Sequence, residues 1–172
     1  MIENKQTEPI PIGINEYGYF NASGDVSCVL LSTLNLLKTI GVKDYSRFNK
    51  YIDNFYELLP RNSGESIAPA RIPYTIEEIT EGEFYGRVVA PDASNALRKM
   101  GFRHPEKYAL DKENLLLPSL YSWSINEHFG HVVVILEFNR REGFSVVDDG
   151  TLMNIDYLPK LGLGYVIERN GR

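Results

Sequence analysis

The apolar positions of residues 28–59 recur at helical spacing. Residues 28–40 are apolar on most faces, which predicts a central, buried helix that ends before Gly41. Residues 44–59 place aromatic and aliphatic side chains along one face, which predicts an amphipathic helix that ends at Pro60. Two such helices in succession indicate that the first part of the chain is mainly helical.

The segments around these helices have weaker patterns. Residues 1–12 contain two prolines and predict an extended arm. Residues 61–87 mix prolines and glycines, which predicts loops with one short helix near residues 75–81. Residues 90–102 predict a further helix, with Pro91 near its start.

Four runs rich in β-branched and aromatic residues lie in the second part of the chain, at residues 115–125, 131–138, 143–149 and 163–169. The residues between the second and third runs, 139–143, are typical of a hairpin loop. Because helices come first and strands follow, the order predicts an α+β fold with an antiparallel sheet, rather than alternating β-α-β units.

The composition fits a single domain spanning residues 1–172. The chain is 43% hydrophobic, enough for a sizeable core, and its single cysteine excludes an internal disulfide. The net charge of −5 argues against nucleic-acid binding, and no apolar run is long enough to cross a membrane. The first residues lack the pattern of a secretory signal, so we expect a cytoplasmic protein, or one delivered elsewhere by a non-classical route. The oligomeric state stays open.

The one cysteine, Cys28, stands where a polar run turns into the predicted buried helix. Ser27 is a candidate cap, which places the thiol in the first turn. Backbone N–H groups there lack helical partners, and the positive end of the helix dipole favours an anion. A thiol in that setting is a better nucleophile at neutral pH. The alternative is a structural role, since a lone cysteine at a helix start is most often a small core residue.

A cysteine nucleophile needs a base, and His131 is the strongest candidate of the three histidines. It opens a strand directly after Gly130, whereas His104 lies in a polar loop and His128 in a turn. A strand end beside a loop holds a side chain in place yet leaves it accessible. His128 and His131 are three residues apart without a third ligand nearby, so we expect no metal site and no cofactor.

The predicted hairpin supplies an acid for this histidine. If the two strands pair, His131 at the start of the first lies beside Asp148 and Asp149 at the end of the second, and a shift of one residue decides which of them faces the ring. Taken singly, a histidine at a strand start and an Asp-Asp-Gly turn are common structural features. Together with Cys28 they have the order and the settings of a thiol-hydrolase triad.

Three segments carry a family resemblance. Residues 27–41 hold the cysteine helix, residues 115–138 hold a tryptophan and the histidine, and residues 144–158 hold the aspartates. They resemble the papain-like cysteine peptidase superfamily and are most similar to the bacteriocin-processing, double-glycine leader peptidase family with its freestanding relatives. The resemblance spans about residues 20–168 and lies in the pattern, without a long identical string.

The match is clearest around the histidine. The family shows a proline-led strand that ends in an aromatic residue, then a short loop, then Gly-His before a valine-rich strand. Pro118, Trp123, Gly130 and His131 fit that order. The position of Trp123 suggests that it forms part of the wall of the site, with a core aromatic as the alternative.

The resemblance implies a papain-like α+β fold, in which the helix bearing Cys28 packs on the antiparallel sheet bearing His131 and Asp148. It implies that Cys28 attacks the carbonyl of a peptide or amide as a thiolate. His131 then acts first as base and later as acid, and Asp148 orients the ring, with Asp149 as the other candidate. The partner would be a peptide or protein substrate, cleaved through a thioester.

The chain departs from the family near the expected oxyanion hole. The family's glutamine lies six residues before the cysteine, where this chain has Ala22. Asn21, one residue earlier, carries a side-chain amide able to donate in its place, together with the N–H of Cys28. Val29 stands where the family usually has glycine. These departures leave two alternatives open, a non-catalytic papain-like interaction module and an acyltransferase that uses the same triad.

Overall fold

The computed structural model describes residues 12–23, 26–61, 67, 69–125 and 130–171. All of the predicted arm except its last residue, Ile12, therefore lies outside the described residues. Within the described parts of the chain, no helix combines the length and the apolar character needed to cross a membrane.

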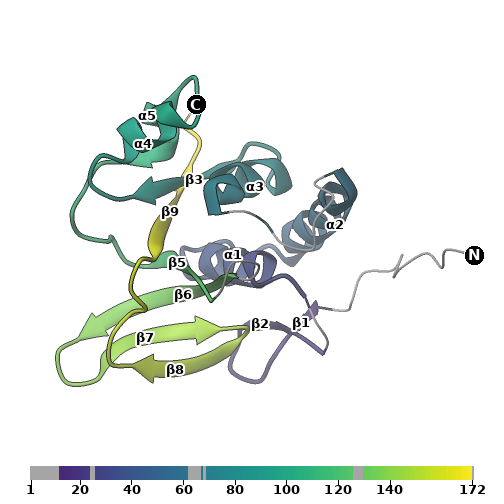
Figure 1. Ribbon diagram of the computed structural model, residues 1–172. Helices are drawn as coiled ribbons and strands as arrows, with labels where there is room; N and C mark the ends of the chain where they lie inside the picture. Colours follow the sequence, from purple (N-terminus) through teal and green to yellow (C-terminus); the bar gives the residue numbers. More distant parts are fainter. Residues whose placement is uncertain (1–11, 24–25, 62–66, 68, 126–129, 172) are drawn as a thin grey trace, which may run out of the picture.

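A seven-stranded sheet in the order β4-β3-β9-β5-β6-β7-β8 forms the frame of the molecule (Figure 1). Neighbouring strands are antiparallel, except that β3 and β4 are parallel. A separate two-stranded hairpin, β1–β2, precedes the first helix. The strands are β1 (Ile12–Ile14), β2 (Phe20–Ala22), β3 (Phe84–Val89), β4 (Ala109–Leu110), β5 (Ser119–Ser124), β6 (Gly130–Asn139), β7 (Gly143–Asp148), β8 (Thr151–Ile155) and β9 (Leu163–Arg169).

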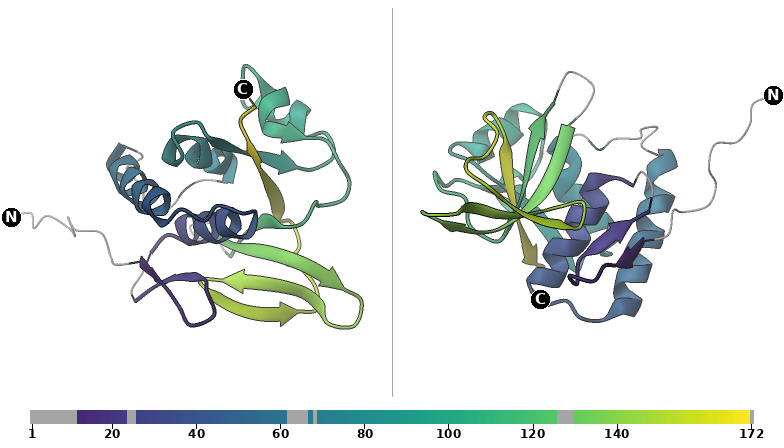
Figure 2. Two further views of the ribbon diagram at one scale, coloured as in Figure 1. Left: turned by 180° about the vertical axis from the view of Figure 1, so that it is seen from behind. Right: turned by 90° about the horizontal axis from the view of Figure 1, so that it is seen from below.

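Helices cover one face of this sheet. The helix α1 contacts β5 and β6, and α3 contacts β3 and α2. Seen from below, α1 and α2 lie beside one face of the curved sheet (Figure 2). The helices are α1 (Cys28–Thr39), α2 (Tyr45–Arg61), the short 3-10 helix η1 (Pro69–Arg71), α3 (Ile72–Ile79), α4 (Ala93–Lys99) and α5 (Pro105–Tyr108).

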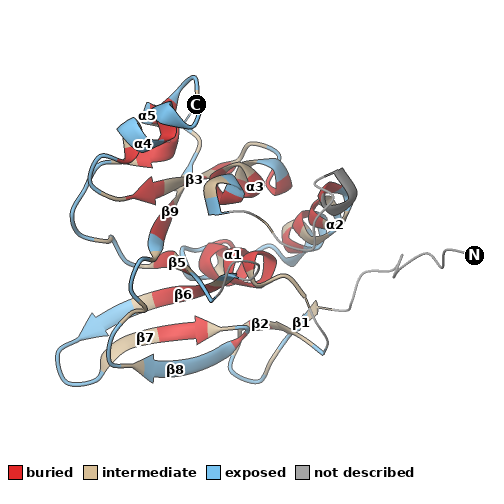
Figure 3. Cartoon of the chain, in the orientation of Figure 1, coloured by how far each residue is buried: buried red, intermediate tan, exposed pale blue. Residues whose placement is uncertain are grey.

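The main core lies between α1 and the sheet. Leu30, Leu34 and Leu37 on α1 are fully buried, and they share one cluster with Val132 and Val134 of β6. Figure 3 shows α1 as almost entirely buried, in contrast to β8 at the edge of the sheet. Because successive side chains of a strand point to opposite faces, Val133 and Ile135 of β6 enter a second, smaller cluster on the far face.

The α+β class is confirmed, and the predicted helices are present with shifted ends. The first spans Cys28–Thr39, as its pattern predicts. The second continues through Pro60 and ends at Arg61, so the predicted stop at that proline is wrong. The short helix begins at Ile72, earlier than predicted.

The four predicted strands and the hairpin loop between β6 and β7 are also present. The prediction of loops up to residue 87 is wrong at β3, which pairs with β9 inside the sheet. A Cβ added to Gly86 would lie 3.0 Å from the backbone of Pro73, so this glycine allows α3 to approach the strand closely. In the sequence the same glycine indicates a break. The sheet therefore takes a strand from the helical first part, and β8 was missed as well.

A buried amide joins α1 to β2. Asn35 on α1 is only 1% exposed. Its Oδ1 accepts a bond from the backbone N–H of Phe20 at 2.7 Å, and its Nδ2 donates to the backbone carbonyl of the same residue at 3.1 Å. The hairpin is thus fixed to the helix by two directional bonds within the core.

We expect Asn35→Ala to lower the free energy of unfolding by about 2–3 kcal/mol, because it leaves a buried N–H and a buried carbonyl without partners. Urea denaturation would measure the loss. As a control, Asn154→Ala removes an amide from an exposed position on β8, where Asn154 accepts a bond from Ser145, and should change the free energy by less than about 0.5 kcal/mol. Equal effects of the two substitutions would contradict the role of Asn35.

Candidate active site

Cys28 is the first residue of α1 and is half-buried at the edge of the main core. Ser27 occupies the N-cap position, but its hydroxyl makes no capping bond, so the capping role expected for it is wrong. The first bond of the helix ladder runs from the N–H of Leu31 to the carbonyl of Ser27. The N–H groups of the first turn therefore have no acceptor within the helix, and no acidic side chain lies there to balance their positive end.

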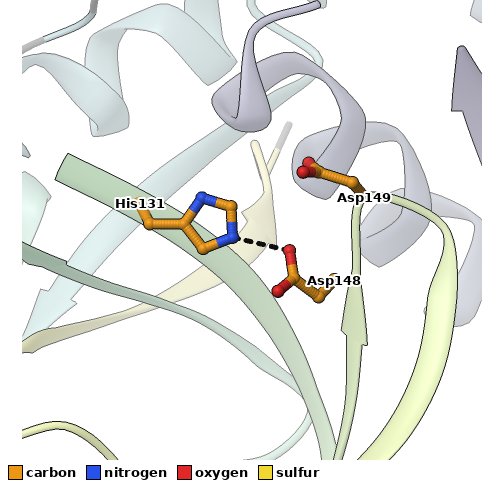
Figure 4. Close-up of side chains that lie close together, drawn as sticks. All are labelled: His131, Asp148 and Asp149. Atoms are coloured by element: carbon orange, nitrogen blue, oxygen red, sulfur yellow. Dashed lines mark hydrogen bonds and ion pairs between the residues drawn. The ribbon is translucent and has the colours of Figure 1, made fainter. Parts of the chain in front are cut away.

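His131 is the second residue of β6 and forms a close pair with Asp148, the last residue of β7. Nε2 of the ring lies 2.6 Å from Oδ1 of Asp148 (Figure 4). The strand register explains the contact: Val134 pairs with Val147, which places His131 and Asp148 diagonally on the same face. Of the two candidate acids, the structure brings Asp148 to the ring.

Cys28 also acts on the ring of His131. A side-chain hydrogen bond with Cys28 is the largest cause that raises the pKa of His131, to about 9. Burial opposes the increase, and the hydrogen bond and charge of Asp148 add to it. Since Nε2 is bonded to Asp148, Nδ1 is the nitrogen left for the sulfur. The ring of His131 is thus bonded to Asp148 at 2.6 Å, and the thiol of Cys28 is near enough to dominate the shift of its pKa.

Asp149 follows directly in the turn to β8 and is exposed as a whole. Burial of its carboxyl group raises its pKa, and the charge of Asp148 acts in the same direction, while His131 opposes both. Figure 4 shows Asp149 beside the ring but without a bond to it. Its charge is near enough to act on the pair without taking part in the hydrogen bonds.

These side chains also have the spacing of a metal cluster. His131, Asp148 and Asp149 each offer one ligand atom, and these atoms lie within 4.8 Å of one another. The expectation of no metal site assumed that no third ligand was near, whereas the structure brings two carboxylates to the ring. A metal ion on Nε2 would displace the proton that bonds to Asp148, so a metal there and the His131–Asp148 hydrogen bond exclude each other.

Trp123 lies against the histidine on the neighbouring strand. It pairs with His131 across β5 and β6, and the two rings meet edge-on with centroids 5.2 Å apart. The indole also packs on the smaller cluster of the far face. It therefore covers one side of the imidazole and adds no charge.

Asn21, the expected oxyanion donor, lies on β2 against the turn that follows Asp148. A Cβ added to Gly150 would approach the Cβ of Asn21 to 2.7 Å. The side chain is half-buried, and no hydrogen bond joins its amide to another residue that the structure describes. Asn21 is thus placed beside the turn that follows Asp148.

His104 is not part of this group. It is exposed, and its Nδ1 lies 3.6 Å from Oε1 of Glu106. His128 lies outside the described residues. Residues that the sequence interpretation missed include Asn15 and Asn35, whose amides hold the β1–β2 hairpin. Asn15 with the glycine three residues later is a turn signal that could have predicted this hairpin.

Comparisons of the chain with models of protein families, with curated proteins and with solved structures found no match.

We expect Asp148→Asn to lower the pKa of His131 from about 9, because it replaces the charged acceptor of the ring proton by a neutral amide. Asp149→Asn is the matched control, since it removes the neighbouring charge but no bond to the ring, and it should have the smaller effect. Titration of the ring signals by NMR would measure both values. A larger shift in the Asp149 variant would reverse the assignment.

The raised pKa also predicts how stability depends on pH. The folded value of about 9 exceeds the ordinary value of 6.5, so the stabilisation from the His131 imidazolium is complete below pH 6.5 and is lost as pH rises through about 9. We expect the difference in free energy of unfolding between the wild type and His131→Ala to shrink over that range. Urea denaturation at several pH values would measure it, with His104→Ala as the control. A difference independent of pH would count against the charged pair.

Proposed function

We propose that the protein is a cysteine-dependent hydrolase of papain-like type that cleaves a peptide or amide bond. Cys28 would be the nucleophile, His131 the base and Asp148 the acid that orients the ring. The observation that carries the proposal is the bond between His131 and Asp148, together with the raised pKa of His131, to which Cys28 contributes most. The family resemblance around the same residues supports it.

The arrangement suits attack by a thiolate. An imidazolium beside the sulfur stabilises the negative charge, and so does the start of α1. The sulfur of Cys28 would attack the carbonyl carbon and form a tetrahedral intermediate, whose oxygen would accept bonds from the N–H of Cys28 and the amide of Asn21. When the C–N bond breaks, His131 donates its proton to the leaving amine and a thioester remains on Cys28.

Water completes the cycle. His131, now neutral, takes a proton from a water molecule that attacks the thioester, and the sulfur leaves as a carboxylic acid forms. The sum of the two steps is one amide and one water converted to one acid and one amine. Asp148 would keep the imidazole in place throughout, because its bond to Nε2 leaves Nδ1 directed at the sulfur and the substrate.

A different class of function stays as the alternative. Ala22 and Val29 depart from the family beside the nucleophile, which favours a papain-like module that binds a partner without catalysis. An acyltransferase would share the first half-reaction and differ only in what attacks the thioester. The reactivity of the thiol distinguishes the hydrolase from the binding module. The identity of the product distinguishes the hydrolase from the acyltransferase.

The first test is alkylation of Cys28 by iodoacetamide across a range of pH. At pH 6 we expect the wild-type thiol to react at least about tenfold faster than a model thiol, because only the ionised form is nucleophilic. His131→Ala should abolish the excess rate. The matched control is His104→Ala, which removes another histidine that faces a carboxylate, but one that is exposed. A metal chelator should leave the rate unchanged.

The second test incubates the wild type and Cys28→Ala with a mixed pool of peptides. New peptide termini formed by the wild type and absent with Cys28→Ala would establish hydrolysis, whereas transfer to an added amine would point to an acyltransferase. A thiol that is unreactive in the wild type, or indifferent to His131, would contradict the proposal and favour the binding module.

A further inference from the structure

The turn that carries the acids is a tight connection between β7 and β8. Asp148 pairs with Thr151, so Asp149 and Gly150 form the whole loop. Both have positive φ, 47° and 88° respectively. The strand that follows is exposed at the edge of the sheet (Figure 3), so little of the sheet supports this turn from that side.

The β1–β2 hairpin supplies the missing support. Gly150 is buried beneath it, and a Cβ added there would come within 2.7 Å of both the carbonyl oxygen of Phe20 and the Cβ of Asn21. The backbones of β2 and of the turn are therefore in direct contact, which only glycine allows. The Gly of the Asp-Asp-Gly sequence is thus a docking point as well as a turn residue.

One side chain ties the two together. Nδ2 of Asn15 donates to the carbonyl of Gly150 at 2.8 Å. Its Oδ1 accepts the backbone N–H groups of Tyr17 and Tyr19, each at 3.0 Å. The amide is held at both ends, so its direction toward Gly150 is fixed by the hairpin turn.

The hairpin is anchored at its other end to the nucleophile's helix. Asn35 on α1 bonds both backbone groups of Phe20. A continuous path of hydrogen-bonded segments therefore runs from α1, which begins with Cys28, through β2 and Asn15 to the turn beside Asp148.

We propose that Asn15 is a positioning residue, which fixes the Asp149–Gly150 turn so that Asp148 keeps its bond to His131. The β1–β2 hairpin acts as a brace between the helix of the nucleophile and the turn of the acid. The catalytic importance of the brace rests on the proposed function, whereas its effect on the histidine does not. Among the residues that the structure describes, the charged or titratable groups that act on the ring are Cys28 from α1, Asp148 from β7 and Asp149 from the turn.

The test compares Asn15→Ala and Asn15→Ser with the wild type. Serine keeps a hydroxyl that accepts a bond from the local backbone, as in a serine turn, but is too short to reach Gly150. It therefore removes the tie with the least damage to the hairpin. Asn54→Ala is the matched control, because Asn54 is also half-buried and its Nδ2 also donates to a backbone carbonyl at 2.8 Å, that of Ile79 between α2 and α3.

NMR titration of the His131 ring is the decisive readout, with thermal unfolding measured alongside. We expect both Asn15 variants to weaken proton binding by the ring about tenfold, which is one pH unit, because Asp148 loses its fixed position. Asn54→Ala should lower the unfolding temperature by a similar amount and leave the titration of the ring unchanged. A role of Asn15 in stability alone would leave that titration unchanged as well, and this result would overturn the proposal.

Alkylation of Cys28 at pH 6 in the same variants separates this proposal from the proposed function. If the wild-type thiol is unreactive but the titration of His131 still changes in the Asn15 variants, the hydrolase is contradicted and the brace is supported. If the thiol is reactive, and substitution of Asn15 changes neither its alkylation rate nor the titration of His131, the hydrolase is supported and the brace is contradicted.

Discussion

The burial of α1 is the constraint on which the rest of the structure depends. Every residue in the range 29–37 is buried, between the sheet and the neighbouring helix. A helix buried on all sides needs partners for its polar side chains. Ser32 donates to a carbonyl of β6 at 2.9 Å, and Asn35 bonds to both backbone groups of Phe20. These directional bonds fix the rotation and the axial position of the helix, so the core also decides where its first residue, Cys28, lies.

The histidine meets this thiol from the opposite face of the sheet. Val132 and Val134 point into the core beneath α1, whereas Val133 enters the cluster on the far face. His131 is two residues from Val133, so it lies on the same far face. Further along β6 the sheet itself would separate such a side chain from the helix. His131 lies at the end of the strand, where Cys28 acts on its pKa and the tryptophan meets the ring edge-on. The position at a strand start therefore suits contact with a thiol on the helix side of the sheet.

This geometry explains how much was predictable from the sequence. The buried helix, the four strands and the nearness of His131 to the two aspartates follow from periodicity and from one short hairpin, which are local properties. The choice between Asp148 and Asp149 needed the register, which a bulge near Leu136 shifts. The strand β3 was missed because Gly86 resembles a break, although it serves close packing on α3. The brace was missed because the bond from Asn15 to Gly150 joins residues 135 positions apart, and no local pattern reports such a contact.

The brace bears on the departures from the family as well. In the proposed reaction the triad accounts for the nucleophile and the proton transfers, while the oxyanion donors decide how much the transition state is stabilised. The donor that would replace the family's glutamine, Asn21, lies on the same hairpin that holds Gly150. One short element would then set both the acid and the oxyanion donor relative to Cys28. A shift of the donor by one residue along the chain need not abolish the chemistry, because its position is set by the contact between β2 and the turn rather than by its distance in sequence from the cysteine.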